Sequence, residues 1–229
     1  SKSVLENKEK RTSTMIAMPP KFVAFDLETT GLSFQKDEII EIGAVKFTVE
    51  VKNGKVFPKL EKEFETFVKP NQMIPAEASN VNHIYDKDVQ DAPPVGDAIK
   101  KFAAFCGQTS ILIAHNANFD ATFMRNAYRA NPQFIPSNPV VDSLAITKAI
   151  MPEAGSHRLG ILANMFQKSG EITMNIDSSK MHRAVYDCEM LMEVFVAVLR
   201  RRLKEKDWEM MNIMASLEKY KGVPQFLNK

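Results

Sequence analysis

The feature that most constrains the fold is an apolar run over residues 21–28, KFVAFDLE, which ends in two carboxylates. A short run that is apolar on both sides predicts a strand buried within a larger sheet. Asp26 and Glu28 are two positions apart, so a strand directs both side chains to the same face. Two like charges brought together in this way are costly unless a cation neutralises them. A solvated strand end with unrelated acids is the alternative interpretation.

The rest of the pattern predicts a mixed α/β fold. Strand patterns follow over residues 39–51 and 64–68, and Asn53-Gly54 between them predicts a tight hairpin turn. The first three strands are therefore expected to be antiparallel. Beyond them, helical spacing alternates with two short apolar runs. The predicted helices cover residues 95–105, 119–130, 159–166, 183–206 and 208–220, and the predicted strands cover 110–114 and 140–141. We expect one five-stranded mixed sheet flanked by helices.

The chain divides into three segments. Residues 1–20 are polar and end in Pro19-Pro20, which predicts a mobile leader. Residues 21–200 form the predicted mixed domain, and residues 201–229 a helical extension. No apolar run approaches the roughly 18 residues of a membrane span, and the N-terminus lacks the apolar region of a secretory signal. We therefore expect a cytoplasmic protein with no membrane partner.

Charge and cysteine content exclude several classes of protein. Thirty Lys and Arg against 28 Asp and Glu give a net charge of +2. This excludes a polybasic protein that holds nucleic acid by bulk charge, because phosphate binding of that kind needs a large excess of cations. Cys106 and Cys188 have no partner at zinc-ligand spacing, so we expect free, buried thiols.

A second acidic motif is HNANFD, residues 115–120, which follows the predicted strand at 110–114. Asp120 lies in or near the first turn of the next helix, where the helix dipole favours a carboxylate. A simple helix-capping role is an equal alternative for this residue.

The third motif is HRAVYD, residues 182–187. His182 and Asp187 are separated by about 140° around an ideal helix, so they do not share a helix face. They can converge only if His182 lies on the loop before the helix and Asp187 lies in its first turns. A surface or capping histidine is the alternative.

Together, FDLETTGL (25–32), HNANFD (115–120) and HRAVYD (182–187) resemble the motifs of the DEDDh, or DnaQ-like, family of 3′→5′ exonucleases. This family includes the proofreading subunit and the inserted exonuclease domain of bacterial replicative polymerases such as DNA polymerase III. Each motif alone is weakly specific, but the three motifs together, in this order and on the predicted elements, are a strong signal. The resemblance covers about residues 21–200 and implies an RNase H-like fold.

The resemblance also implies a site for two divalent metal ions. Its four acidic ligands are Asp26, Glu28, Asp120 and Asp187. Oxygen ligands select hard cations, so Mg²⁺ or Mn²⁺ is expected. His182 takes the role of the general base that deprotonates the attacking water, since an ordinary imidazole pKa of about 6.5 suits this task at neutral pH. The implied product is a 5′-mononucleotide released from the 3′ end.

A further set of residues is implied to hold the substrate: Thr29, Thr30, Gly31, Leu32, Asn116 and Phe119. The first three turn the backbone against the terminal 3′-hydroxyl. Leu32 and Phe119 pack against the last bases, with a place in the core as the alternative for both. Asn116 orients the terminal phosphates or its own loop.

Several polar residues are left outside the predicted site. His83 stands where the family usually has Gly and can alter the wall of the nucleotide pocket. Asp142 is interpreted as a helix cap. His115 and His157, for which the sequence shows no clear partner, are interpreted as structural or surface groups. The basic run from Arg200 to Lys206 is interpreted as solvated at a helix end rather than as a DNA contact.

Three functions remain open. The first is a DNA 3′→5′ exonuclease acting on single-stranded or frayed ends, either in proofreading with a polymerase or in DNA repair. The second keeps the chemistry but acts on RNA, as in RNase T-like and oligoribonuclease-like enzymes. The third, a non-catalytic module that binds nucleic acid or a polymerase, does not explain why all four acids and the histidine are present.

Overall fold

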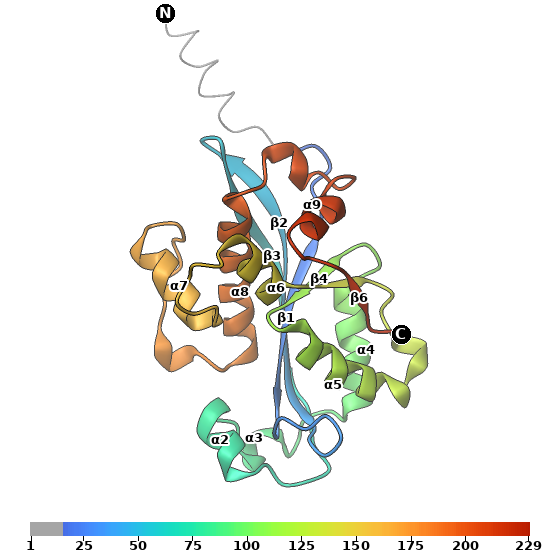
Figure 1. Cartoon of the computed structure of the whole chain (residues 1–229). Coiled ribbons are helices and arrows are strands. Elements are labelled where there is room, and N and C mark those ends of the chain that lie inside the picture. Colours follow the sequence, from blue (N-terminus) through green and yellow to red (C-terminus); the bar gives the residue numbers. More distant parts are fainter. Residues whose placement is uncertain (1–15) are drawn as a thin grey trace, which may run out of the picture.

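A six-stranded mixed sheet runs through the computed structural model, which describes residues 16–229 (Figure 1). The strand order is β3-β2-β1-β4-β5-β6. The strands are β1 (Phe22–Thr29), β2 (Ile39–Lys52), β3 (Lys55–Phe67), β4 (Ile111–Ala114), β5 (Pro139–Asp142) and β6 (Gln225–Phe226). The first three are antiparallel, while β4 and β5 run parallel to β1. The predicted mixed α/β sheet with an antiparallel first half is confirmed.

The turn between β2 and β3 follows from its sequence. Asn53 and Gly54 have φ angles of 51° and 74°. A type I′ hairpin turn needs positive φ at both central positions, and Asn-Gly accepts this with little strain.

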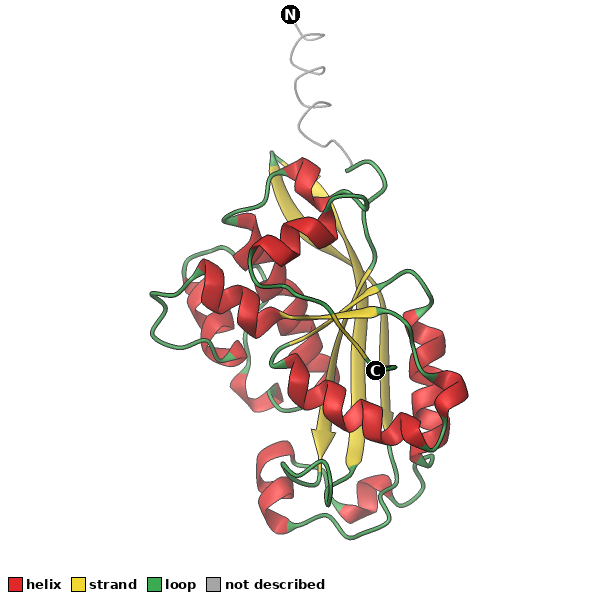
Figure 2. Cartoon of the chain, turned by 45° about the vertical axis from the view of Figure 1, so that its right-hand side comes forward, coloured by secondary structure: helices red, strands yellow, loops and turns green. Residues whose placement is uncertain are grey.

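Helices cover both faces of the sheet (Figures 1 and 2). Helices α4 and α5 pack on one face, and α7 and α8 on the other, whereas α2 and α3 lie at the end of the sheet where β1 ends. The helices are α2 (Ala76–Asn82), α3 (Asp86–Val89), α4 (Val95–Cys106), α5 (Ala117–Arg129), α6 (Ser143–Ile150), α7 (Leu159–Lys168), α8 (Ala184–Arg200) and α9 (Ile213–Lys219). None of the helices within residues 16–229 is long and apolar enough to cross a membrane.

Alternation along β1 divides the core in two. Phe22 contacts Phe195 of α8, with ring centroids 5.5 Å apart, and Phe25 contacts Phe102 of α4 at the same distance. Even-numbered residues of β1 therefore face α8 and odd-numbered residues face α4 and α5. Asp26 and Glu28 continue the even series, which places them on the α8 face.

The predictions for the C-terminal segment need correction. The sheet has six strands rather than five, because Gln225 and Phe226 pair with β5. A two-residue strand carries no periodic signal, which is why the sequence did not predict it. The segment 201–229 is therefore not purely helical, and it packs into the domain through Trp208, which is fully buried against Phe22 and Phe195.

The end of the long helix also differs from the prediction. Helix α8 ends at Arg200 instead of continuing to residue 206. The Arg200 guanidinium donates hydrogen bonds to the carbonyl oxygens of Val56 and Glu171, and Arg201 pairs with the Glu171 carboxylate at 3.1 Å. The first two cations of the basic run are therefore structural contacts rather than free solvated charges.

The predicted leader is shorter than expected. Ile16 is buried in the core cluster that also contains the apolar residues of α8, and the Thr48 hydroxyl donates a 2.8 Å hydrogen bond to the Pro20 carbonyl. Residues 16–20 are therefore part of the packed domain, whereas residues 1–15 lie outside the described structure.

Candidate active site

Three carboxylates converge where β1 meets the first turns of α8. One carboxylate oxygen from each of Asp26, Glu28 and Asp187 lies within 4.8 Å of the others. The period of the strand brings the first two together, and the helix brings the third from more than 150 residues away in the sequence. The sequence-predicted acids on β1 and α8 thus form one cluster.

Gly43 allows α8 to approach the sheet this closely. It is the partner of Asp26 in the β1–β2 register. A Cβ atom at this position would lie 2.4 Å from the backbone of both Ala184 and Val185, far inside van der Waals contact. The missing side chain therefore leaves the space in which the first turn of α8 packs. This packing brings Asp187 to the carboxylates of β1.

Asp120 completes the acidic group from a different element. It lies in the first turn of α5 and is only 4% exposed. The N-cap position of α5 belongs to Asn116, so Asp120 is not the capping residue. Its charge acts on both Asp26 and Glu28 and raises the pKa of each. It stands beside the three-carboxylate cluster rather than inside it.

The electrostatics of the group favour a bound cation. Burial, followed by the charges of neighbouring acids, raises the pKa of Asp26 well above its ordinary value and that of Glu28 to about 9. Burial also raises the pKa of Asp120 to about 8 and that of Asp187 to about 6. Without a cation, these four carboxyl groups resist ionisation, and a divalent cation stabilises their charged forms. The donor set is oxygen only, which fits Mg²⁺ or Mn²⁺.

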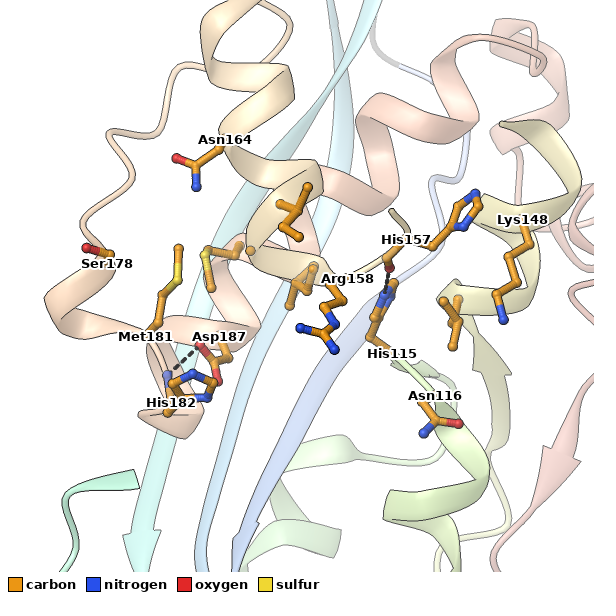
Figure 3. A pocket seen from close by; sticks show the side chains of 15 residues that line it. His115, Asn116, Lys148, His157, Arg158, Asn164, Ser178, Met181, His182 and Asp187 are labelled. Atoms are coloured by element: carbon orange, nitrogen blue, oxygen red, sulfur yellow. Dashed lines mark hydrogen bonds between the residues drawn. The ribbon is translucent and has the colours of Figure 1, made fainter. Parts of the chain in front are cut away.

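His182 lies on the loop that precedes α8, as convergence with Asp187 requires. Its φ angle of 67° turns the backbone so that its N–H donates a 3.1 Å hydrogen bond to Asp187 Oδ1 (Figure 3). The side chain is exposed, and its ring makes no hydrogen bond to any residue from 16 to 229. The ring is therefore not held by a neighbouring group of the described chain.

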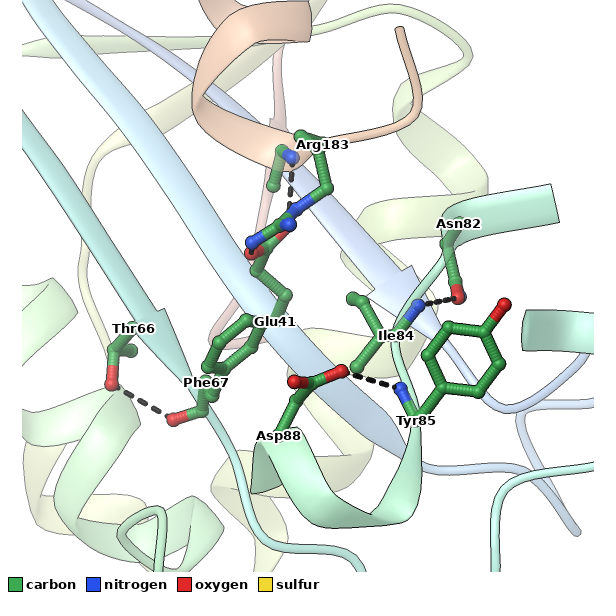
Figure 4. Close-up of polar contacts among 9 residues, drawn as sticks. Glu41, Thr66, Phe67, Asn82, Ile84, Tyr85, Asp88 and Arg183 are labelled. Atoms are coloured by element: carbon green, nitrogen blue, oxygen red, sulfur yellow. Dashed lines mark hydrogen bonds and ion pairs between the residues drawn. The ribbon is translucent and has the colours of Figure 1, made fainter. Parts of the chain in front are cut away.

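Sequence reasoning missed Glu41, which anchors the start of α8 (Figure 4). This carboxylate on β2 is 3% exposed and accepts hydrogen bonds from the Ala184 N–H at 2.8 Å and from Arg183 Nη2 at 3.1 Å. It is also the register partner of Glu28. The available signal was a single acid within the apolar strand IIEIGAV. Glu41 thereby ties the histidine loop to the strand beside the acidic cluster.

The loop after β1 is held by Asp37, a second residue that the sequence did not reveal. The Asp37 carboxylate accepts hydrogen bonds from the Thr30 hydroxyl at 3.2 Å and from the Ser33 N–H at 2.8 Å. It lies so close to Gly31 that a Cβ there would be 2.3 Å from its Oδ2. A side chain at position 31 would therefore displace the Asp37 carboxylate from these hydrogen bonds.

The predicted substrate residues around this loop separate into buried and exposed groups. Thr29 and Thr30 are buried, and the side chain of Asn82 donates to the Thr29 carbonyl at 3.4 Å. Leu32 is 86% exposed, which excludes the core as its location. Phe119 is half-buried, and its ring centroid lies 5.0 Å from that of Phe123. Phe119 therefore contributes to both the core and the surface.

Asn116 and Asp142 are linked at the second motif. Asn116 is exposed and left-handed, with φ of 71°, and its N–H donates to Asp142 Oδ1 at 2.9 Å. The same oxygen accepts the Leu144 N–H at 3.0 Å, so the predicted capping role of Asp142 is confirmed. Asp142 fixes the Asn116 loop as well as capping α6.

The other histidines have structural surroundings. Both ring nitrogens of His115 are occupied, by the Ser143 hydroxyl at 2.8 Å and the His157 carbonyl at 2.6 Å. Burial lowers the pKa of His115. The ring of His157 bonds the Met151 carbonyl at 2.7 Å. Both histidines thus have partners that the sequence did not reveal, and of the two interpretations, structural or surface, the structural one holds. His83 is exposed at the left-handed C-cap of α2, a position that ordinarily favours glycine.

Comparison with known proteins identifies the family. The model of the RNase T-type exonuclease family matches residues 23–195. The chain belongs to the exonuclease family. The predicted DEDDh resemblance, and with it a nuclease enzyme, is thereby confirmed.

The curated relatives of this exonuclease chain are much longer proteins. It is 38% identical over 168 residues to a PolC-type DNA polymerase III from Oceanobacillus iheyensis, an alignment that covers 73% of this chain and 11% of that protein. It is 37% identical over 180 residues to the PolC-type DNA polymerase III of Bacillus subtilis, covering 78% and 11%.

Solved structures of low sequence identity share the RNase H-like fold. Exonuclease X, in a complex with 5′ overhanging duplex DNA, matches with a TM-score of 0.59 at 20% identity, over 85% of this chain and 98% of the other. E. coli exonuclease I bound to single-stranded DNA matches with a TM-score of 0.63 at 17% identity, over 83% and 43%. A 3′-exonuclease bound to a histone mRNA stem-loop gives 0.61 at 14% identity, over 82% and 85%. These matches confirm the predicted fold.

Proposed function

We propose that this chain is a metal-dependent 3′→5′ exonuclease that removes 5′-mononucleotides from single-stranded or frayed DNA ends. The observation that carries the proposal is the convergence of Asp26, Glu28 and Asp187 within 4.8 Å, next to the free ring of His182. The alternative, a solvated strand end with unrelated acids, does not explain why these three carboxylates and the histidine lie together.

The four acids would serve two divalent metal ions. Asp26, Glu28 and Asp187 would hold one ion, and Asp26 with Asp120 would hold the other. When bound, two such ions stabilise the charge on the attacking and the leaving oxygen of an in-line displacement. The raised pKa values of the carboxylates mean that ion binding and carboxylate ionisation favour each other.

His182 would accept the proton of the attacking water. Its backbone bond to Asp187 fixes the loop relative to the acidic cluster, while the exposed ring remains accessible to substrate and solvent. General-base catalysis of this kind contributes about 10²–10⁴-fold. The other nearby imidazole, on His115, is unsuited to this role because both of its nitrogens are hydrogen-bonded.

The loop after β1 would receive the terminal nucleotide. Asp37 accepts a hydrogen bond from the Thr30 hydroxyl, and Asn82 donates one to the Thr29 carbonyl. The loop of Thr29, Thr30 and Gly31 that they hold would contact the 3′-hydroxyl. The exposed side chain of Leu32 would then pack against a base. Contact with the face of a base tolerates any sequence, as removal of successive nucleotides requires.

A DNA polymerase is the proposed partner. Two relatives aligned over most of this chain are PolC-type DNA polymerases III. Together with such a polymerase, this chain would remove mispaired nucleotides from a frayed primer end.

The proposal is tested with 5′-labelled single-stranded DNA, a duplex with a 3′ mismatch, and RNA of the same sequence. We expect stepwise shortening of the DNA from its 3′ end with Mg²⁺ or Mn²⁺, release of 5′-mononucleotides, and no reaction in EDTA. Asp26→Ala should abolish the reaction. DNA that stays intact with both metals would refute the proposal, and a strong preference for RNA would favour the exoribonuclease alternative.

A further inference from the structure

A groove of about 800 Å³ leads away from the acidic cluster between α6, α7 and the histidine loop. His182 and Asp187 lie at one side, while Lys148 of α6 and Arg158, just before α7, lie farther along it (Figure 3). This volume falls within the range of about 300–1,000 Å³ that is typical of ligand sites. The groove is therefore large enough to bind more than the group at the cleavage point.

The charges in the groove suit a polyanion. In Figure 3 the Arg158 guanidinium lies between the His182–Asp187 pair and His115, and the Lys148 ammonium lies beyond His115. Both side chains are exposed, and neither forms an ion pair or side-chain hydrogen bond with residues 16–229. Asp187 is the only acid among the described lining residues. Two free cations next to a site for phosphodiester cleavage are placed to contact phosphates.

The remaining wall of the groove is largely apolar. Leu144, Leu159, Ile161 and Met181 contribute to it, and Ile161 is 50% exposed. Unpaired bases can bury their apolar surface against such a wall, whereas the bases of a duplex remain stacked on one another. An apolar wall combined with free cations therefore fits a single strand better than a duplex.

The position of the groove assigns it to a particular part of the substrate. Leu32 and Phe119, which are proposed to contact the terminal bases, do not line it. The catalytic residues His182 and Asp187 do, so the groove is continuous with the cleavage point but leads away from the terminal-nucleotide loop. We propose that it binds the nucleotides of single-stranded DNA on the 5′ side of the scissile bond, with Arg158 and Lys148 contacting their phosphates. This inference rests on the proposed exonuclease function.

The test compares substrates of two and eight nucleotides with the variants Arg158→Gln and Lys148→Gln. A dinucleotide has only the scissile phosphodiester, whereas an octanucleotide has six further ones upstream. Each variant should raise KM for the octanucleotide about fivefold, as expected for one exposed ion pair, and leave kcat and the dinucleotide KM unchanged. Each should also reduce the salt dependence of binding by about 0.7 on a log–log scale. Lys101→Gln, an exposed lysine of α4 outside the groove, is the matched control and should change nothing.

Two measurements distinguish a failure of the groove assignment from a failure of the proposed exonuclease function. If hydrolysis proceeds but both variants keep the wild-type octanucleotide KM and salt dependence, the groove assignment is wrong and the exonuclease proposal stands. Binding of labelled octanucleotide in EDTA, followed by fluorescence anisotropy, tests the groove independently of turnover. Unchanged anisotropy curves in both variants would overturn the assignment, and weakened binding of an RNA octanucleotide without weakened DNA binding would overturn the choice of DNA.

Discussion

The replacement Gly43→Ala tests whether the distance between β2 and α8 sets the active site. The added Cβ would lie 2.4 Å from backbone atoms of Ala184 and Val185, whereas ordinary contact begins near 3.4 Å. The start of α8 must therefore move outward by about 1 Å, the difference between these two distances. Because backbone atoms are involved, no side-chain rotation can relieve the contact.

This displacement carries two costs. Overpacking of a well-filled site typically destabilises a protein by about 1–3 kcal/mol, which the better strand propensity of Ala offsets by about 0.5–1 kcal/mol. We therefore expect a net loss of about 1–2 kcal/mol in the free energy of unfolding. A catalytic group misplaced by about 1 Å costs about 10²-fold in rate, so kcat should fall by that factor while the variant stays folded.

The measurements are urea unfolding followed by circular dichroism, and steady-state hydrolysis of single-stranded DNA. Gly155→Ala is the matched control, because a Cβ at Gly155 meets nothing within 4 Å and its φ is not left-handed. A folded Gly43→Ala variant with wild-type kcat would show that the placement of Asp187 does not depend on the α8 contact with β2.

Four further results are expected. His182→Ala should lower kcat by about 10²–10⁴-fold, and its unfolding midpoint in urea should stay at the wild-type value because the ring is exposed and unpaired. Leu32→Ala should leave thermal stability unchanged, since the side chain is 86% exposed. It should weaken binding of DNA 3′ ends by about 1.5–3 kcal/mol, because an apolar side chain buried against a base is lost. Glu41→Ala should cost about 1–3 kcal/mol of stability in urea titrations by leaving the buried Ala184 N–H unpaired, and conservative Glu41→Gln should lose less. In EDTA the melting temperature should fall as pH rises from about 4 towards 9. The reason is that the folded pKa values of Glu28 and Asp120 are raised to about 9 and about 8, so the stability present below the unfolded pKa is lost when these groups ionise. Mg²⁺ or Mn²⁺ should make the melting temperature less dependent on pH, and a melting temperature that rises with pH in EDTA would contradict the electrostatic account.

The sequence predicted those parts of the site that depend on local periodicity. The two-residue period of β1 brings Asp26 and Glu28 to one face, and the helical period shows that His182 must precede the helix of Asp187. Both relations hold in the structure. Local geometry was sufficient because each pair lies within one element or at its end.

Glu41 and Asn82 could not be predicted because their partners are distant in the sequence. Glu41 bonds residues that are 142 and 143 positions away, and Asn82 bonds the Thr29 carbonyl 53 positions away. Nothing in the residues around Glu41 indicates that the N-terminus of a helix packs against its carboxylate. Likewise β6 has only two residues, and its pairing with β5 depends on where the preceding segment packs.

The pairing of β1 with β2 explains why the supporting residues lie where they do. Asp26 pairs with Gly43, and Glu28 pairs with Glu41. Thus, each proposed ligand on β1 stands beside a β2 residue that acts on α8: Gly43 admits the helix, and Glu41 holds its first N–H. The same helix start carries Asp187 and fixes the backbone of His182. A change in β2 is therefore transmitted to the ligand on α8 and to the base together, although no residue of β2 is itself a proposed ligand or base.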